Sequence, residues 1–152
     1  MVNLNKQQKI LCQLRKDARM PLTTMSRKTG IAVSTIFDKI KSYQGDLITK
    51  HTCLINFGNL GYSACAKIIV KVDREKREEL KKYLNKNPNV NSLFKINNGY
   101  DFMFEAIFPN LKDIEDFLES MEDKFRITEK QVFYIIEDIK RECFMEDYSI
   151  TV

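Results

Sequence analysis

Residues 20–43 read MPLTTMSRKTGIAVSTIFDKIKSY, and this stretch decides the fold of the first third of the chain. Pro21 is tolerated in the first turn of a helix, and Gly30 is typical of the left-handed residue that ends one. Only Gly30, Ile31 and Ala32 separate this helix from the next one. Two short helices joined by a tight glycine turn are typical of a helix-turn-helix motif.

The second of these helices is expected over residues 33–43, with two different faces. The apolar face is expected to hold Val33, Ile36, Phe37, Ile40 and Tyr43. Short hydroxyl side chains near a helix N-terminus can reach base edges or phosphates in a major groove, and lysines behind them can neutralise phosphate charge. The side chains that we expect to contact DNA, on both helices, are Thr23, Arg27, Lys28, Ser34, Thr35, Asp38, Lys39 and Lys41.

A further helix precedes the motif. Asn5 can cap a helix that runs to about residue 16, with Ile10, Leu11 and Leu14 on one face. A plain three-helix bundle with a polar outer face is the alternative to a DNA-binding unit. The charge distribution alone does not decide, but together with the spacing of the turn it favours the DNA-binding unit. Residues 1–50 hold ten basic and three acidic side chains, whereas the remaining residues hold 15 basic and 18 acidic ones. A basic unit before a mildly acidic one is typical of polyanion binding.

The second half of the chain alternates between strands and helices. The alternating apolar residues Ala64, Ala66, Ile68, Val70 and Val72 predict a strand over residues 63–72. Further elements are expected as a helix at 74–87, strands at 90–97 and 102–108, a helix at 111–121, and a strand within 127–139. Asn98-Gly99 predicts a two-residue hairpin. The order β-α-β-β-α-β is ferredoxin-like, so the fold class is α+β, an N-terminal winged-type helix-turn-helix followed by a ferredoxin-like domain.

We expect four segments along the chain. They are a helix-turn-helix DNA-binding domain at residues 1–50, an extended linker at 51–61, a ferredoxin-like effector and oligomerisation domain at 62–142, and a C-terminal tail at 143–152. Two helices cover only one face of a four-stranded sheet, yet apolar residues point to both faces. Those expected on the uncovered face include Ile69, Met103, Ile107, Phe133 and Ile135. A large apolar patch marks an interface, so we infer a homodimer through this face.

Composition limits the remaining possibilities. With 43% hydrophobic and 30% charged residues, the chain is neither collagen-like nor intrinsically disordered. It has neither a run of about 18 apolar residues nor a signal-peptide pattern, so we expect a cytoplasmic protein without a membrane partner. Cys12, Cys53, Cys65 and Cys143 form no Cys-x-x-Cys pair, and His51 is the only histidine. We therefore expect four buried, reduced thiols and neither a metal nor another cofactor.

These features together resemble the leucine-responsive/AsnC (feast/famine) family of prokaryotic transcription regulators, over about residues 4–140. The positions that match its first domain are Leu4, Ile10, Leu11, Leu14, Asp17, Arg19, Leu22, Met25, Gly30, Ser34 and Ile40, and those that match its linker are Ile55, Asn56, Leu60 and Gly61. The most specific match is Gly99-Tyr100-Asp101, which is similar to the Gly-x-Tyr-Asp element at the family's effector site.

The resemblance implies a regulator that binds double-stranded DNA and assembles as dimers or octamers. It also implies a small-molecule effector, an amino acid, bound between protomers near Gly99, Tyr100 and Asp101. Asp101 could accept from the ligand's ammonium group while turn amides donate to its carboxylate, or it could simply brace the hairpin. Two other functions stay open: a nonspecific architectural DNA binder, and a decarboxylase-type enzyme on a related fold. The enzyme is disfavoured because His51, in a linker, is poorly placed for proton transfer.

Overall fold

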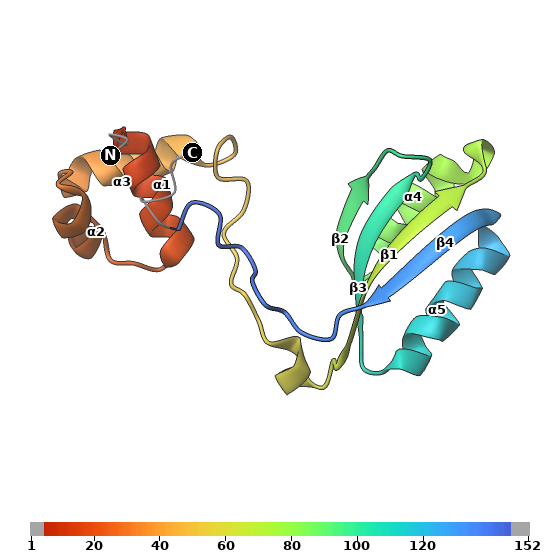
Figure 1. Ribbon diagram of the computed structural model, residues 1–152. Helices are drawn as coiled ribbons and strands as arrows, with labels where there is room; N and C mark the ends of the chain where they lie inside the picture. The colour runs from red at the N-terminus through yellow and green to blue at the C-terminus, as the bar shows by residue number, and fades with distance from the viewer. Residues whose placement is uncertain (1–4, 147–152) are drawn as a thin grey trace. The chain divides into compact units, whose positions relative to one another are not determined.

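The computed structural model describes residues 5–146 (Figure 1). The chain divides into two compact units, which we call the head (residues up to 54, with those from 139 onward) and the body (residues 55–138). Leu4 and the last six residues of the expected tail lie outside the described residues.

The head contains the three expected helices, α1 (Lys6–Lys16), α2 (Leu22–Thr29) and α3 (Val33–Tyr43). Asn5 caps α1, because its side chain accepts from the Gln8 N–H at 2.9 Å while the Gln8 side chain accepts from the Asn5 N–H at 3.0 Å. Gly30 ends α2 with φ 71°, and its N–H donates to the Ser26 carbonyl. The predicted start of α1 and the predicted end of α2 are therefore confirmed.

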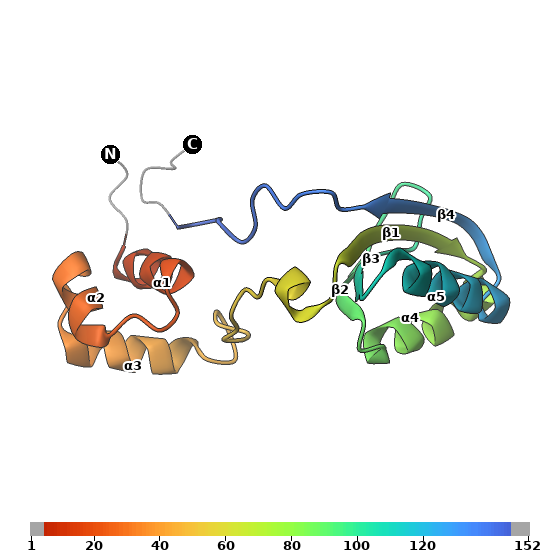
Figure 2. The ribbon, with the colours of Figure 1, turned by 90° about the horizontal axis from the view of Figure 1, so that it is seen from below.

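The three head helices, drawn in Figure 2, pack around a small apolar core. Its buried members are Ile10, Met25, Ile31, Ile36 and Tyr43. Val33 and Phe37, which we expected on the same inner face of α3, are instead 39% and 55% exposed. The inner face is centred on Ile36 and Tyr43, and Phe37 lies about 100° around the helix from Ile36. The predicted apolar face was therefore too wide.

The segment after α3 forms a tight turn. The Ile48 N–H donates to the Tyr43 carbonyl at 2.8 Å, and Gly45 adopts φ 83°. An isolated parallel bridge joins Gln44 to Ile48. The linker expected to be extended at residues 51–61 contains no strand: residues 51–56 have no regular secondary structure, and Phe57–Leu60 form a 3-10 turn.

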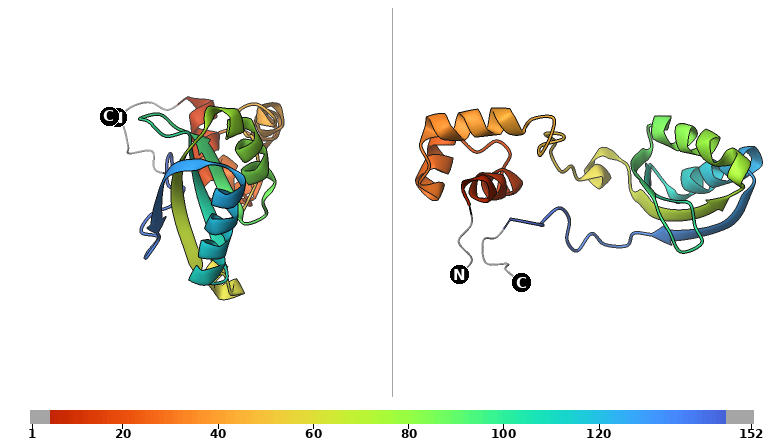
Figure 3. Two further views of the ribbon diagram at one scale, coloured as in Figure 1. Left: turned by 90° about the vertical axis from the view of Figure 1, so that its right-hand side faces the viewer. Right: turned by 90° about the horizontal axis from the view of Figure 1, so that it is seen from above.

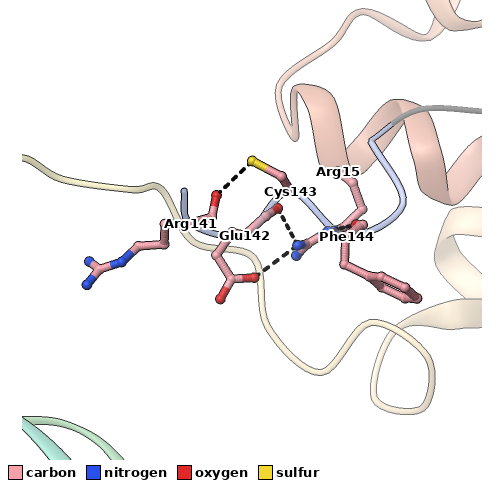
Figure 4. A network of polar contacts seen from close by, with 5 residues as sticks. All are labelled: Arg15, Arg141, Glu142, Cys143 and Phe144. Atoms are coloured by element: carbon pink, nitrogen blue, oxygen red, sulfur yellow. Dashed lines mark hydrogen bonds and ion pairs between the residues drawn. The ribbon is translucent and has the colours of Figure 1, made fainter. Parts of the chain in front are cut away.

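Residues 142–144 lie against α1 within the head (Figure 4). The Arg15 Nε donates to the Phe144 carbonyl at 3.1 Å, and its Nη2 donates to the Glu142 carboxylate at 2.9 Å and to the Glu142 carbonyl. The guanidinium of Arg15 thus binds two residues of the C-terminal segment, Glu142 and Phe144. We call this contact the Arg15 clamp.

The body contains β1 (Ala64–Val72), α4 (Arg77–Lys86), β2 (Val90–Lys95), β3 (Phe102–Phe108), α5 (Leu111–Lys124) and β4 (Ile127–Tyr134), with a 3-10 turn at Arg74–Lys76 before α4. The four strands form one antiparallel sheet in the order β2-β3-β1-β4. Figures 2 and 3 show α4 and α5 on the same face of this sheet. The ferredoxin-like order is confirmed, and the last strand lies within residues 127–139 as expected.

The body's core lies between the sheet and its two helices. Every second residue of β1 is buried, as the alternating pattern predicts, and Phe104 of β3 packs edge-on against Phe117 of α5 at 6.3 Å between ring centroids. At the sheet edge, Tyr134 of β4 donates to Glu115 of α5, and Lys130 pairs with Glu122. The hydrogen bond to Glu115 raises the pKa of Tyr134 above its usual value. These contacts hold α5 on β4.

The hairpin between β2 and β3 has the expected turn. Asn98 and Gly99 both adopt positive φ, at 62° and 87°, and the Ile96 N–H donates to the Asp101 carbonyl below them. Positive φ at both central residues is the condition that Asn-Gly satisfies at low cost.

The four cysteines are free but differ in exposure. Cys12 is buried, Cys65 and Cys143 are half-buried, and Cys53 is exposed, so the expectation of four buried thiols is wrong. Burial raises the pKa of the Cys12 thiol above its usual value. No helix within residues 5–146 is long and apolar enough to cross a bilayer.

We expect native protein at pH 8 to be alkylated by iodoacetamide at Cys53 first and at Cys12 last. The thiolate is the nucleophile, so a raised pKa and a side chain only 2% exposed both slow the reaction of Cys12. Peptide mass spectrometry over time measures the order. The difference in alkylation rate between Cys53 and Cys12 should vanish in urea. Equal rates in native protein would contradict the buried placement of Cys12.

Candidate DNA-binding face and hairpin site

One side of α2 and α3 carries the residues expected to contact DNA. Thr23, Arg27, Lys28, Ser34, Asp38, Lys39 and Lys41 are exposed and Thr35 is half-buried. The apolar side chains of the same helices form the head core, so burial of that core turns the polar residues outward. The structure thus brings the predicted side chains of two helices onto the accessible surface of one unit.

The basic side chains on this side have few acidic partners within the protein. Among the described residues, Lys28, Lys39 and Lys41 have no acidic partner, and Arg27 contacts only the Thr24 hydroxyl, at 3.4 Å. The Ser42 hydroxyl donates to the Lys39 carbonyl at 2.8 Å, so this hydroxyl is engaged by the backbone of its own helix. Uncompensated cations on an exposed helix are suited to bind phosphates.

Phe37 belongs to this face although the sequence placed it in the core. With Leu22, Ile40, Lys41 and Gln44 it lines an open hollow of about 300 Å³. The sequence did contain a sign that one of these side chains is exposed, because five apolar residues in an 11-residue helix are more than a small core can cover.

The hairpin residues Gly99, Tyr100 and Asp101 lie together at one end of the sheet. The Tyr100 hydroxyl accepts from the Gln131 Nε2 at 2.6 Å, which connects the turn to β4. Nearby, Lys71 forms an ion pair with Glu129 at 2.7 Å, and this hydrogen bond raises the pKa of Lys71. The sequence alone did not indicate these β4 partners.

Asp101 is the buried centre of the hairpin site. Its Oδ2 accepts from the Val72 N–H at 2.9 Å, and its Oδ1 pairs with the Arg77 Nε at 2.7 Å. Its own N–H donates to the Val70 carbonyl at 2.9 Å. The carboxylate therefore fastens the turn to the end of β1 and to the first residue of α4. The half-exposed Arg77 has further N–H groups besides the Nε–H that pairs with Asp101.

The sheet face opposite α4 and α5 carries apolar side chains, with polar ones such as Lys67 and Gln131 between them. Ile69, Met103, Ile107 and Phe133 alternate with the core residues of their strands, as expected, and Phe94 of β2 joins them. Phe94 and Phe133 are each about half exposed, at 52% and 51%. The buried Glu105 accepts from the Asn91 Nδ2 at 2.6 Å on this face. We call this surface the open sheet face.

Comparison with known families and sequences gives a consistent set of matches. Residues 65–143 match the model of the Lrp/AsnC ligand binding domain. The HTH-type transcriptional regulator FL11 of Pyrococcus furiosus is 33% identical over 112 residues, which cover 73% of this chain and 74% of that protein. The siroheme decarboxylase of Hydrogenobacter thermophilus is 27% identical over 137 residues, which cover 87% of this chain but 41% of that enzyme.

Solved structures share this fold. A transcriptional regulator from Neisseria meningitidis, solved as its L-Met complex, superposes with a TM-score of 0.81 at 19% identity, over 91% of this chain and 94% of that one. E. coli AsnC superposes with a TM-score of 0.78 at 14% identity, over 93% and 97% of the two chains. At these identities the likeness establishes the fold.

Proposed function

Because the chain belongs to the Lrp/AsnC family of DNA-binding transcription regulators, we propose that its head reads duplex DNA through α2 and α3 while its body pairs with a second copy and binds a small effector. The observation that supports this assignment best is the exposed side of α3, where Lys39 and Lys41 have no acidic partner among the described residues.

The polar residues of this side divide into two roles. Lysines with uncompensated charge bind phosphates, which gives affinity for any duplex. Ser34 and Thr35, in the first turn of α3, are short enough to contact base edges. Selection from a random duplex pool separates the two roles: a single palindromic motif supports a sequence-specific regulator, and an unselected pool supports a nonspecific architectural protein.

We expect the double substitution of Lys39 and Lys41 by alanine to weaken binding to all duplexes. The slope of log affinity against log salt should become less negative by about one unit for each lost phosphate contact. Fluorescence anisotropy at several salt concentrations measures this slope. Lys81 and Lys82, exposed on α4, are a matched control pair whose replacement should leave the slope unchanged. An unchanged slope for the α3 variant would show that this helix does not meet DNA.

The open sheet face supports the homodimer. Two copies joined through this face would remove Phe94 and Phe133 from water, and two heads would then meet two half-sites of a palindrome. Higher assembly into octamers is part of the same proposal and is measured by light scattering.

The effector site is proposed at the hairpin. A structural neighbour binds L-Met, and an amino acid here would meet the turn amides near Gly99 and the remaining N–H groups of Arg77. These donors suit a carboxylate. Binding should change DNA affinity with a coupling of about 1–3 kcal/mol. Calorimetry with the twenty amino acids at millimolar concentration tests it, and the absence of any heat would remove the effector proposal.

We further propose that the chain is a regulator and not an enzyme, acting in the cytoplasm where the DNA lies. The matched regulator FL11 shares most of its length with this chain, whereas the decarboxylase match spans less than half of that enzyme.

A further inference from the structure

Phe37 occupies an unusual position on α3. It is 55% exposed, whereas its neighbour Ile36 is fully buried. Val33 lies one turn before it and Lys41 one turn after it, so the three side chains form one stripe along the helix. Because more than half of this aromatic side chain is exposed beside an open hollow that Leu22 and Ile40 also line, it is available to a partner outside this unit.

The surroundings of Phe37 define what that partner must offer. The open hollow beside it has apolar walls from Leu22 and Ile40, and Lys41 and Gln44 at its polar side. A ligand that fits must present a small apolar group next to negative charge. The major groove of DNA does so at each thymine, where a C5-methyl group projects between two lines of phosphates.

Charge argues against a second copy of the head as the occupant. The surrounding side of α2 and α3 carries Arg27, Lys28, Lys39 and Lys41 against the single acid Asp38. Two such faces would repel each other, whereas a polyanion is attracted to this one.

We propose that Phe37, supported by Val33, contacts a thymine methyl group in the major groove and thereby fixes a T at one position of each half-site. This inference rests on the proposed DNA-binding function and adds an apolar contact to the hydroxyl and lysine contacts already assigned. Apolar contact with the methyl group distinguishes thymine from cytosine and from uracil.

The test uses the full-length protein and duplexes recovered from the random pool. Each thymine is replaced in turn by deoxyuridine, which removes only the methyl group. At one thymine per half-site, wild-type affinity should fall about fourfold, the effect of uncovering one methyl-sized group. The variant Phe37→Ala should bind thymine and deoxyuridine duplexes equally, and Phe37→Leu should keep part of the discrimination.

The controls separate this contact from other effects. Leu111→Ala removes a similarly exposed apolar side chain from α5 and should keep the full methyl discrimination. Wild-type protein that selects a motif but is indifferent to every deoxyuridine would overturn the Phe37 contact while leaving the regulator intact. Failure to select any motif would overturn both. A Phe37→Ala variant that changes oligomeric state and keeps its methyl discrimination would assign the hollow to a protein partner instead.

Discussion

Replacing Asp101 by alanine is expected to lower the free energy of unfolding by about 2–4 kcal/mol. The carboxylate is only 11% exposed and has two partners, the Val72 N–H at 2.9 Å and the Arg77 guanidinium at 2.7 Å. Alanine leaves the Val72 N–H buried without an acceptor, and this is the larger cost. The Arg77 pair adds less because Arg77 is half exposed and screened by water.

Urea unfolding followed by circular dichroism measures this loss. Asp101→Asn keeps an oxygen for the Val72 N–H and gives up the charge, so it should lose roughly half as much as alanine. Asp116→Ala, on the exposed side of α5, is the matched control and should stay close to wild type. An alanine variant of wild-type stability would show that the carboxylate does not brace the turn. Calorimetry on the asparagine variant then reports separately on amino-acid binding.

The second large effect is expected at the open sheet face, where Phe133→Lys should split the proposed homodimer. Phe133 is opposite Lys67 of β1 in the sheet, so the substitution would place two ammonium groups side by side in the interface between the two copies. The symmetry of the dimer introduces this penalty twice. We expect the dissociation constant of the dimer to rise at least about a hundredfold, the equivalent of about 3 kcal/mol.

Phe133 is a better choice than Ile107. Ile107 faces the same side but is already buried within a single chain, where it is only 9% exposed. A charge at Ile107 would disturb the chain itself, whereas Phe133 is half exposed. Leu111→Lys, 56% exposed on α5, gives a matched control that should remain dimeric. Sedimentation velocity at micromolar concentration measures both, and a monomeric wild type or an unaffected Phe133→Lys variant would exclude this face as the interface.

Features that depend on a few neighbouring residues were predictable from the sequence. Asn5 and Gln8 form their capping box within one helical turn, and Asn98-Gly99 sets its hairpin by its own preference for positive φ. The alternation of β1 predicted its buried face correctly, because every second side chain of a strand points the same way.

Features that depend on distant residues were not predictable. Phe37 was placed in the core because periodicity gives an apolar stripe but not its width, which the neighbouring helices decide. The Asp101 carboxylate bonds to a backbone group 29 positions away, and no pattern within the hairpin specifies that partner. The 3-10 turn within the linker that we expected to be extended was likewise not indicated by any local pattern.

The Arg15 clamp changes how the head is tethered. The chain passes between the head and the body twice, around residues 54 and 138, and the clamp joins positions 127 apart in sequence. A unit held by one flexible segment explores a large volume, whereas a second attachment shortens its reach. In a dimer, the reach of one head sets the effective concentration at which it finds the second half-site once the first is bound. We therefore expect Arg15, on the helix that precedes the helix-turn-helix motif, to influence the half-site spacing that the proposed dimer tolerates.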